Sequence, residues 1–478
     1  MKRPSSPAWR WRSTAGAVFE QFDFTVRRKD NGSGVGELGV VKIRLRDIRD
    51  DLSWRMRRYR AGRARARSRA VFIGITGSSG KSTATSLLGH ILAGHGTVHT
   101  QVLANTLKAL IRTLYKRMRR AGKVDYVVFE AGAFQPGSIR PMAEMLKPDV
   151  AVVTMVRLEH FAQFRRLEAV AQEKKALVEV LPLGGLAILN ADDPHVLGMA
   201  SDVRGRVATF GQSETADYRV TDVHAAYPNL LGFSLRWSGG AIDVQTPFPG
   251  EHFWLPAAAA IVTALELGVP PEEVVARTAS FEPLANRCKV EAIDGGPQFI
   301  IDAAKAPWHS LNIAFEMVAK ARAVRKRIVL GQISDYAGSS RKYRTAYGVA
   351  RGIADEVIYT GDNAHRSRAS QADRDSGRFL ELRTPKEVSD HIKQTAVPGE
   401  LILLKSSANL HLERIALAWT HDVKCWIPAC GKNEGCYTCG LYEVPFEEHE
   451  SFLASRRVER RRPRFGWLLG GLNLTRPS

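Results

Sequence analysis

Short apolar runs recur along the chain, and each is followed by a loop and then by a helical pattern. Between residues 71 and about 200 the runs are VFIGITG, YVVFEAG, DVAVVTMV and LAILNADD. A second series further along comprises QFIIDAAK, RIVLGQIS, DEVIYTGD and ELILLKSS. Near-continuous apolar strands that alternate with helices are typical of parallel sheets covered on both faces. We therefore predict an α/β chain with a central parallel-sheet domain and a smaller, Rossmann-like α/β domain after it.

The pattern also suggests where these domains begin and end. We predict a basic N-terminal segment over 1–65, the central domain over 66–284, the second α/β domain over 285–420, and a Cys-rich and Arg-rich tail over 421–478. Within the central domain, residues 207–250 read as a short β-rich insertion ahead of an alanine-rich helix. In open parallel sheets, ligands collect at the carboxyl ends of the strands. The residues that close each apolar run are therefore the candidates for a functional site.

The first apolar run leads into a loop of small residues. In VFIGITGSSGKSTATSLLGHIL a strand gives way to a loop and then to a helix that starts near Lys81. Backbone N–H groups of such a loop converge on an anion, and the positive end of the helix dipole faces the same place. Lys81 adds a charge for the β- and γ-phosphates, and the hydroxyl of Ser82 or Thr83 reaches a Mg²⁺ ion bound to them. The loop itself consists of Gly77, Ser78, Ser79 and Gly80.

This loop departs from the strict eight-residue phosphate-loop pattern, because Ile75 stands where the pattern has glycine. A tight strand-to-helix turn without a ligand is the alternative. We predict nucleotide binding and hence a P-loop-type ATPase domain. The remaining motifs indicate which reaction the nucleotide takes part in.

The amino-acid composition limits the classes of function that the chain can have. The chain has 478 residues, of which 44% are hydrophobic and 25% charged, so it can bury two or three domain cores. The formal charge of +20 resides mostly at the ends: residues 1–70 hold 19 Lys or Arg against 7 Asp or Glu, and residues 455–478 hold seven Arg against one Glu. The nearly neutral middle offers no basic track for a nucleic acid. The basic tails are compatible with peripheral contact with an anionic membrane.

The five cysteines do not form a disulfide framework in so long a chain, and we expect a cytoplasmic protein without a leader or a membrane span. Four of the five cysteines fall within CWIPACGKNEGCYTCG, a spacing compatible with a structural zinc site although not a standard one. Free or redox-active thiols and an iron–sulfur cluster are the alternatives. The candidate ligands are Cys425, Cys430, Cys436 and Cys439.

Four positions after the phosphate loop carry useful chemistry in chain order. Glu130 ends YVVFE, His160 follows VAVVTMVRLE, Lys174 lies in the helical pattern EAVAQEKKAL, and Asn190 ends LAILN. Taken singly, a strand-end carboxylate is usually solvated and a lone histidine is usually structural. Their order behind the loop is what indicates a nucleotide and metal site.

These residues lie in motifs that resemble the Mur ligase family, ATP-dependent enzymes that form amide bonds in peptidoglycan assembly and in folate and polyamino-acid synthesis. The resembling stretches run from about residue 70 to 416 and include GITGSSGKSTAT, VVFEAGAFQPGSI, KPDVAVVTMVRLEHFAQF and GELILLKSSANLHLERI. Within the family, EAGAFQPGSI and the gap from His160 to Lys174 are most similar to the ligase that adds D-alanyl-D-alanine.

The resemblance implies roles for individual residues. Lys81 and Ser82 would bind phosphate and Mg²⁺, Glu130 would hold the same metal, and His160 would ligate a second Mg²⁺. Lys174 matches a lysine that is carbamylated in many members. The other implied contacts are Asn190 near the nucleotide, Arg287 at a phosphate, Asp302 at the ATP ribose and Lys405 near the reacting groups.

The predicted activity is the joining of a small-molecule or peptide carboxylate to an amine through an acyl phosphate made from ATP. A polyamino-acid or specialised-metabolite ligase is one alternative, and an amidating subunit that needs a partner glutaminase is another. A nucleic-acid-binding P-loop ATPase is the alternative from a different class, suggested by the basic ends. The loop alone fits that alternative, whereas the ordered set after the loop does not, so we expect no specific nucleic acid partner.

Overall fold

The computed structural model describes residues 21–25, 40–116, 124–158, 164–334, 339–432 and 434–461. The chain forms two compact units, one of residues 1–68 with 111–122 and the other of residues 69–110 with 123–478. The predicted four-segment division stays a prediction beside this grouping.

The described part of the smaller unit consists of a strand pair, a long basic helix and residues 111–116, which end helix α3 (Leu107–Lys116). Strands β1 (Gln21–Thr25) and β2 (Val40–Arg44) pair in antiparallel fashion, and α1 (Leu45–Arg67) follows directly. Helix α1 therefore forms much of the described part of the basic N-terminal segment. Within this unit the Arg60 guanidinium lies 5.9 Å from the Tyr115 ring centre. None of the described helices combines the length and the apolar character needed to cross a bilayer.

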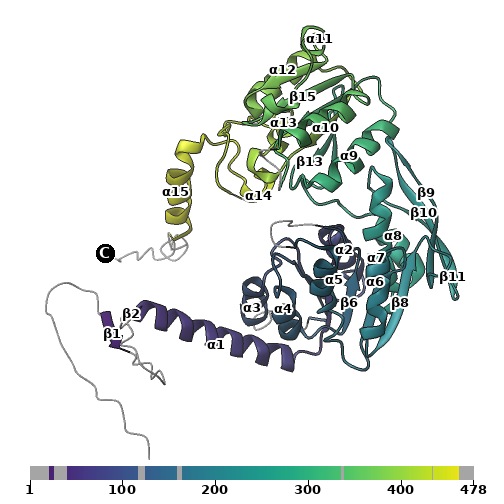
Figure 1. Cartoon of the computed structure of the whole chain (residues 1–478), viewed down its shortest axis with the longest axis vertical. Helices are drawn as coiled ribbons and strands as arrows, with labels where there is room; N and C mark the ends of the chain where they lie inside the picture. Colours follow the sequence, from purple (N-terminus) through teal and green to yellow (C-terminus); the bar gives the residue numbers. More distant parts are fainter. Residues whose placement is uncertain are drawn as a thin grey trace, which may run out of the picture. The chain divides into compact units, whose positions relative to one another are not determined.

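The larger unit contains a nine-stranded sheet in the order β11-β10-β9-β8-β7-β6-β3-β5-β4 (Figure 1). The pairs from β4 to β9 are parallel, whereas β9, β10 and β11 pair in antiparallel fashion. The strands are β3 (Val71–Thr76), β4 (Val98–Gln101), β5 (Tyr126–Glu130), β6 (Val150–Val153), β7 (Leu186–Asn190), β8 (Arg206–Gly211), β9 (Tyr218–Ala226), β10 (Asn229–Trp237) and β11 (Gly240–Gln245). Residues 207–250, expected to be an insertion, therefore extend the same sheet.

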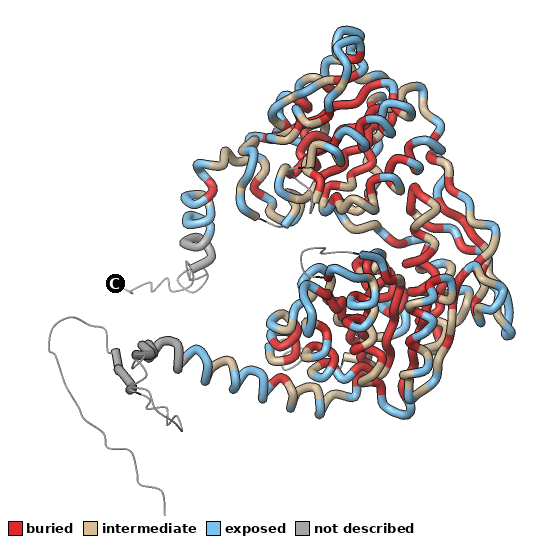
Figure 2. The backbone as a smooth tube through the Cα atoms, viewed as in Figure 1, coloured by how far each residue is buried: buried red, intermediate tan, exposed pale blue. Residues whose placement is uncertain are grey.

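Helices cover both faces of the central part of this sheet, which explains its continuous apolar strands. Every residue of β6 and β7 is buried, as the red segments of Figure 2 show. Helices α2 (Lys81–Leu92), α7 (Trp254–Glu266) and α8 (Pro271–Ala279) pack against one another, and α4 (Ile139–Leu146) packs with α5 (Leu167–Lys175). The remaining helices of this region are α3 (Leu107–Lys116), α6 (Pro194–Leu197) and the 3₁₀ turns η1 (Gly198–Asp202) and η2 (Glu251–Phe253).

A second sheet of six strands follows, in the order β12-β13-β17-β14-β15-β16. Only its edge strand β12 is antiparallel; the other pairs are parallel, as predicted. The strands are β12 (Lys289–Ala292), β13 (Gln298–Asp302), β14 (Lys326–Leu330), β15 (Glu356–Thr360), β16 (Phe379–Leu382) and β17 (Leu401–Lys405). The helices are α9 (Trp308–Lys320), α10 (Ser340–Arg351), α11 (Gln371–Asp375), α12 (Pro385–Thr395) and α13 (Glu413–Leu417), with η3 (Ala364–Ser367) and η4 (Ala408–Leu410).

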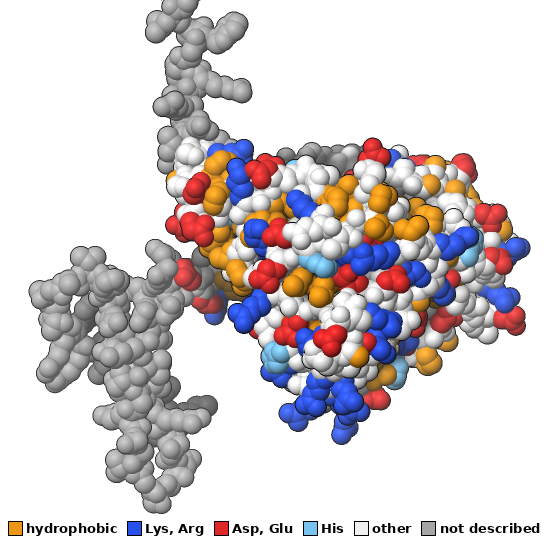
Figure 3. Space-filling model, turned by 90° about the horizontal axis from the view of Figure 1, so that it is seen from above, with side chains coloured by type: hydrophobic (Ala, Val, Ile, Leu, Met, Phe, Trp, Pro, Cys, Tyr) orange, Lys and Arg blue, Asp and Glu red, His pale blue; other side chains and the backbone are white. Residues whose placement is uncertain are grey.

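The described tail folds into short elements only. These are α14 (Cys436–Cys439), η5 (Phe446–Glu448) and α15 (His449–Arg461). On the face drawn in Figure 3, Lys and Arg side chains of the described residues are interspersed with Asp and Glu. Charge of both signs on that face fits the nearly neutral composition of the middle of the chain.

A buried ion cluster closes the amino ends of the second sheet, opposite the end where ligands are expected. The Arg327 side chain is fully buried, and its Nε lies 3.0 Å from Glu400 Oε1 while an Nη lies 3.3 Å from Glu356 Oε2. Burial lowers the pKa of Arg327, although both carboxylates oppose that effect. Removing one member of a buried ion pair leaves the other charge uncompensated.

We therefore expect Arg327→Ala to destabilise the second sheet by about 3–5 kcal/mol. Hydrogen exchange of the β14 and β17 amides measures this. Arg374→Ala is the control, because Arg374 pairs with Glu381 at 3.1 Å on the surface and should contribute less than about 1 kcal/mol. Equal effects of the two substitutions would contradict the role of the buried cluster.

Candidate active site

The phosphate-loop motif forms the turn between β3 and α2. Gly77 has φ 148° and Gly80 has φ 80°, both in the region that favours glycine. A Cβ atom on Gly77 would lie 1.9 Å from Thr154 Oγ1, which is closer than atoms can approach. Glycine is thus required at this position by backbone conformation and by space, and the loop amides are left without side chains over them.

The loop is fixed by the segment that follows β6, residues 154–157. Thr154 Oγ1 donates to the Ser79 carbonyl at 2.6 Å, and the Ser78 amide donates to the Met155 carbonyl at 2.8 Å. Ser78 Oγ donates to the Arg157 carbonyl and accepts from the Arg157 amide, at 2.8 and 2.9 Å. The 154–157 segment was not singled out in the sequence, because only the adjacency of β3 and β6 brings it to the loop.

Glu130 lies at the end of β5, next to β3 in the sheet, and is buried. Its Oε2 accepts from Ser82 Oγ at 3.0 Å and from the Leu103 amide at 2.9 Å, and its Oε1 accepts from Asn105 Nδ2 at 3.0 Å. The structure thus brings together the loop hydroxyl and the strand-end carboxylate that the sequence predicted as Mg²⁺ ligands. Carboxylate, hydroxyl and amide oxygens are the donors that a hard cation prefers. Asn105 is a polar neighbour that sequence reasoning missed.

Asn190 ends β7 and contacts the same segment as the loop does. Its Nδ2 donates to the Thr154 carbonyl at 2.9 Å, and its Oδ1 accepts from the Asp192 amide at 2.9 Å. Asp193 accepts from the Val156 amide at 2.8 Å and from Arg157 at 3.0 Å. The NADD motif therefore holds the 154–157 segment, which in turn holds the phosphate loop.

Lys174 is fully buried, in contrast to a lysine on an ordinary helical surface. Val170 and Leu177, expected on the same face, are buried with it. The flanking lysine behaves differently: Lys175 points to the surface and pairs with Asp202 at 2.8 Å. Glu173 on the other side accepts from the Gly137 and Ile139 amides, each at 2.6 Å, at the start of α4. His160, the predicted ligand of a second Mg²⁺, lies outside the described residues.

A second group of candidates meets at the carboxyl ends of β13 and β17. Asp302 and Lys405 are partners in the parallel register, and Lys405 Nζ lies 2.5 Å from Asp302 Oδ2 and 2.9 Å from the Lys305 carbonyl. Lys405 is almost completely buried. Arg287 lies in the turn before β12, and its Nε is buried without a hydrogen-bond partner among the described residues.

His252 in η2 is electrostatically coupled to this pair. Burial lowers the pKa of His252 to about 4; the Asp302 carboxylate opposes the shift and the Lys405 ammonium reinforces it. The imidazole is accordingly neutral at physiological pH. A histidine of the central domain is thus held beside the charged pair of the second sheet as a neutral hydrogen-bonding group.

Comparison with known proteins finds ligases among the relatives of this chain. Residues 75–264 match the model of the Mur ligase middle domain. The UDP-N-acetylmuramoyl-tripeptide--D-alanyl-D-alanine ligase of Mycobacterium tuberculosis is 27% identical over 383 residues, 74% of each chain, and that of Escherichia coli is 25% identical over 76% of this chain and 80% of its own.

Solved structures share the fold at lower identity. A MurF crystal structure from Acinetobacter baumannii has a TM-score of 0.68 at 22% identity and covers 81% of this chain and 83% of its own. A MurF ligase from Thermotoga maritima in complex with ADP has a TM-score of 0.65 at 18% identity, covering 77% and 83%. These structures show the fold that this chain shares.

The need for glycine at position 77 generates a prediction. Gly77→Ala should abolish nucleotide binding, measured by calorimetric titration with ATP, because the added Cβ displaces Thr154 and with it the Ser79 contact. Gly184→Ala is the control, since a Cβ there meets no atom within 4 Å. Unchanged affinity in Gly77→Ala would show that the loop does not hold the nucleotide.

Proposed function

Because the chain belongs to the Mur ligase family, whose members use ATP and Mg²⁺ to form amide bonds, we propose that it phosphorylates a substrate carboxylate and passes the acyl group to an amine. A carboxylate is a poor electrophile, and an acyl phosphate gives it a good leaving group. Bound ATP and Mg²⁺ supply that phosphoryl group and neutralise its charge. The residues of this chain then have to bind and align the substrates and exclude water from the site.

The contact between Ser82 and Glu130 is the observation that carries the proposal. It places a hydroxyl from the start of α2 and a buried carboxylate from β5 side by side at the edge of a phosphate-type loop. The loop amides face the phosphates, and Ser82 and Glu130 present oxygen donors to the metal beside them. Asn105 and the Leu103 amide hold the carboxylate in place when they donate to it.

The second sheet supplies the other half of the proposed reaction site. Asp302 is assigned to the ATP ribose, Arg287 to a phosphate, and Lys405 to the neighbourhood of the reacting groups. The buried Lys405 ammonium, held between Asp302 and a carbonyl, offers a fixed positive charge beside an anionic group. Holding acid and amine together in this way yields effective molarities on the order of 10⁵ M or more.

The names of the relatives define the first substrates to try. The ligases of M. tuberculosis and E. coli carry UDP-N-acetylmuramoyl-tripeptide and D-alanyl-D-alanine in their names. We propose a peptide-type carboxylate and an amino-acid or dipeptide amine for this chain as well. The alternatives are a polyamino-acid ligase and a subunit that receives ammonia from a partner glutaminase. A screen of acid and amine pairs for ATP-dependent phosphate release would distinguish them by the pair that supports turnover. Because the reaction needs ATP, we expect it in the cytoplasm.

The first test concerns Lys81. Its Nζ donates to the Gly77 carbonyl across the loop at 2.5 Å, so it stands where it can reach a bound phosphate rather than pack in the core. The parent should release phosphate from ATP only when both an acid and an amine are supplied. Lys81→Ala should lose this activity and retain the fold seen by circular dichroism. Turnover retained by Lys81→Ala, or stimulation of the parent by DNA or RNA, would contradict the proposed function.

We propose in addition that Lys174 acts as a carbamate. A buried ammonium costs free energy through desolvation, and a Mg²⁺ ion bound nearby would add repulsion. Addition of CO₂ to Nζ, with release of one proton, turns it into an anion that can accept contacts from the hydration shell of the metal. Burial of Lys174 supports this proposal over the alternative of a surface charge.

Lys174→Ala should therefore lose most activity and regain part of it when acetate is added, because a small carboxylate can occupy the vacated space. Lys175→Ala is the matched control and should change activity little, since its salt bridge with Asp202 faces solvent. Equal activity of both variants and the parent in CO₂-depleted buffer would rule out the carbamate.

A further inference from the structure

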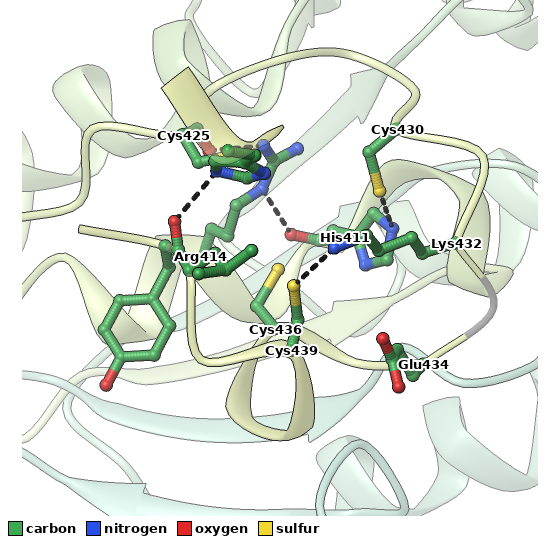
Figure 4. A pocket seen from close by; sticks show the side chains of 11 residues that line it. His411, Arg414, Cys425, Cys430, Lys432, Glu434, Cys436 and Cys439 are labelled. Carbon is green, nitrogen blue, oxygen red and sulfur yellow. Dashed lines mark hydrogen bonds between the residues drawn. The ribbon is translucent and has the colours of Figure 1, made fainter. Parts of the chain in front are cut away.

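The tail folds around a small cavity that the ligase reaction does not use. The cavity measures about 20 Å³, room for roughly one water-sized particle. Figure 4 shows side chains from the tail and from the residues after β17 converging on it. All five cysteines of the chain are free thiols, and four of them line this cavity together with two histidines. The lining residues used below are His411, Cys425, Cys430, Lys432, Cys436 and Cys439.

His411 is the donor that the sequence did not reveal. Its Nδ1 lies 3.2 Å from Glu413 Oε1, and its Nε2 lies 3.1 Å from Cys430 Sγ. When Nδ1–H donates to the carboxylate, Nε2 carries the lone pair that faces the sulfur. A carboxylate that fixes the tautomer of an imidazole in this way is the usual outer partner of a metal-bound histidine.

A buried carboxylate lies next to two of the residues that line the cavity, His411 and Cys436. Glu413 is completely buried, and its Oε2 has no hydrogen-bond partner among the described residues. Its other oxygen, Oε1, lies 3.2 Å from His411 Nδ1 and accepts from the Cys436 amide at 2.8 Å. Arg414 does not neutralise this carboxylate in the described region, because its guanidinium donates to the carbonyls of Leu410, His411 and Cys425.

The thiols complete a donor set around His411. Donor atoms of His411, Glu413 and Cys436 lie within 4.8 Å of one another. Cys439 follows Cys436 by three residues on α14, and Figure 4 shows the two sulfurs pointing toward the same space. Cys425 lies on another segment, where its amide donates to the Tyr442 carbonyl and its carbonyl accepts from Arg414.

We propose that this cavity is a structural site for a zinc-class divalent cation, held by His411 Nε2 and by the thiolates of Cys430, Cys436 and Cys439. Three thiols and one imidazole match the four tetrahedral donors that zinc prefers. Binding releases the three thiol protons to solvent and leaves a site of net charge −1. Lys432 Nζ, 3.0 Å from Cys439 Sγ, offsets that charge. This set differs from the four cysteines that the sequence suggested, since His411 takes the place of Cys425.

Such a site would fasten the tail to the second sheet. His411 and Glu413 follow β17, whereas the cysteines belong to the tail, so one cation would cross-link the two. The linked loop already packs closely: a Cβ on Gly435 would lie 2.6 Å from Asn286 Nδ2, and Tyr437 donates to Glu291 at 2.6 Å. The loop therefore lies beside Asn286, the neighbour of the proposed phosphate contact Arg287.

Metal analysis of the full chain, purified under reducing conditions, is the direct test. The parent should contain about one equivalent of zinc, and cobalt substitution should give thiolate charge-transfer bands with the intense visible bands of a tetrahedral centre. His411→Ala should lose the metal, while the matched His421→Ala should keep it, because His421 is an exposed histidine of the same segment outside the cavity lining. Iron in place of zinc, or no metal in the reduced parent, would overturn the proposal.

Three further variants distinguish the metal ligands from the carboxylate that supports His411. Cys430→Ser should lose the metal and Cys425→Ser should retain it; the reverse result would restore the four-cysteine set and overturn the role of His411. Glu413→Gln should weaken metal affinity by about 10- to 100-fold while the cobalt spectrum keeps its tetrahedral form. These readouts do not depend on ligase activity, so they fail or succeed independently of the proposed function.

Discussion

The close approach of Gly77 to Thr154 is the constraint on which the proposed active site depends. It lets the backbone of the phosphate loop lie against the segment after β6, where Thr154, Met155 and Arg157 take up the polar groups of Ser78 and Ser79. Those contacts order the loop mainly through hydroxyl groups and use the Ser78 amide, which donates to the Met155 carbonyl. The same segment is held from its other side by the NADD motif. Three parallel strands, β3, β6 and β7, thus determine one loop conformation between them.

Charge is distributed between the two ends of the second sheet in a way that matches different tasks. At the amino ends, Glu356 and Glu400 enclose Arg327 and counter its charge, although two of its buried nitrogens have no hydrogen-bond partner among the described residues. At the carboxyl ends, Lys405 and Asp302 form a pair whose acid side is partly open. The enclosed cluster stabilises the sheet, whereas a pair with one open side is accessible to a ligand.

Sequence reasoning succeeded where a local pattern determines the structure. The apolar runs predicted both sheets. The small residues after β3 predicted the loop, because the glycines and the start of the helix follow one another directly in the sequence. Glu130 was singled out because it ends an apolar run, whereas Asp302 came only from the family resemblance. Thr154, Asn105 and His411 were missed because their importance comes from strand order and loop packing, which no spacing within the sequence reveals. Residues 207–250 were recognised as β-rich, but their place in the same sheet was not predicted, because β8 joins β7 by parallel pairing, which leaves no turn signal.

In the tail, the order of residues along the chain suggested a metal site built from tail residues alone. A C-x-x-C pair and two further cysteines read as a self-contained metal knuckle when only the chain order is visible. In the folded chain, however, Glu413 and His411 come from the turn that follows β17, the strand that also carries Lys405. A buried carboxylate with one orphan oxygen, an imidazole whose free nitrogen faces a thiol, and thiols from two tail segments meet only after the second sheet has formed. Formation of the tail would then follow that of the ligase domain, and a bound cation would stabilise both together.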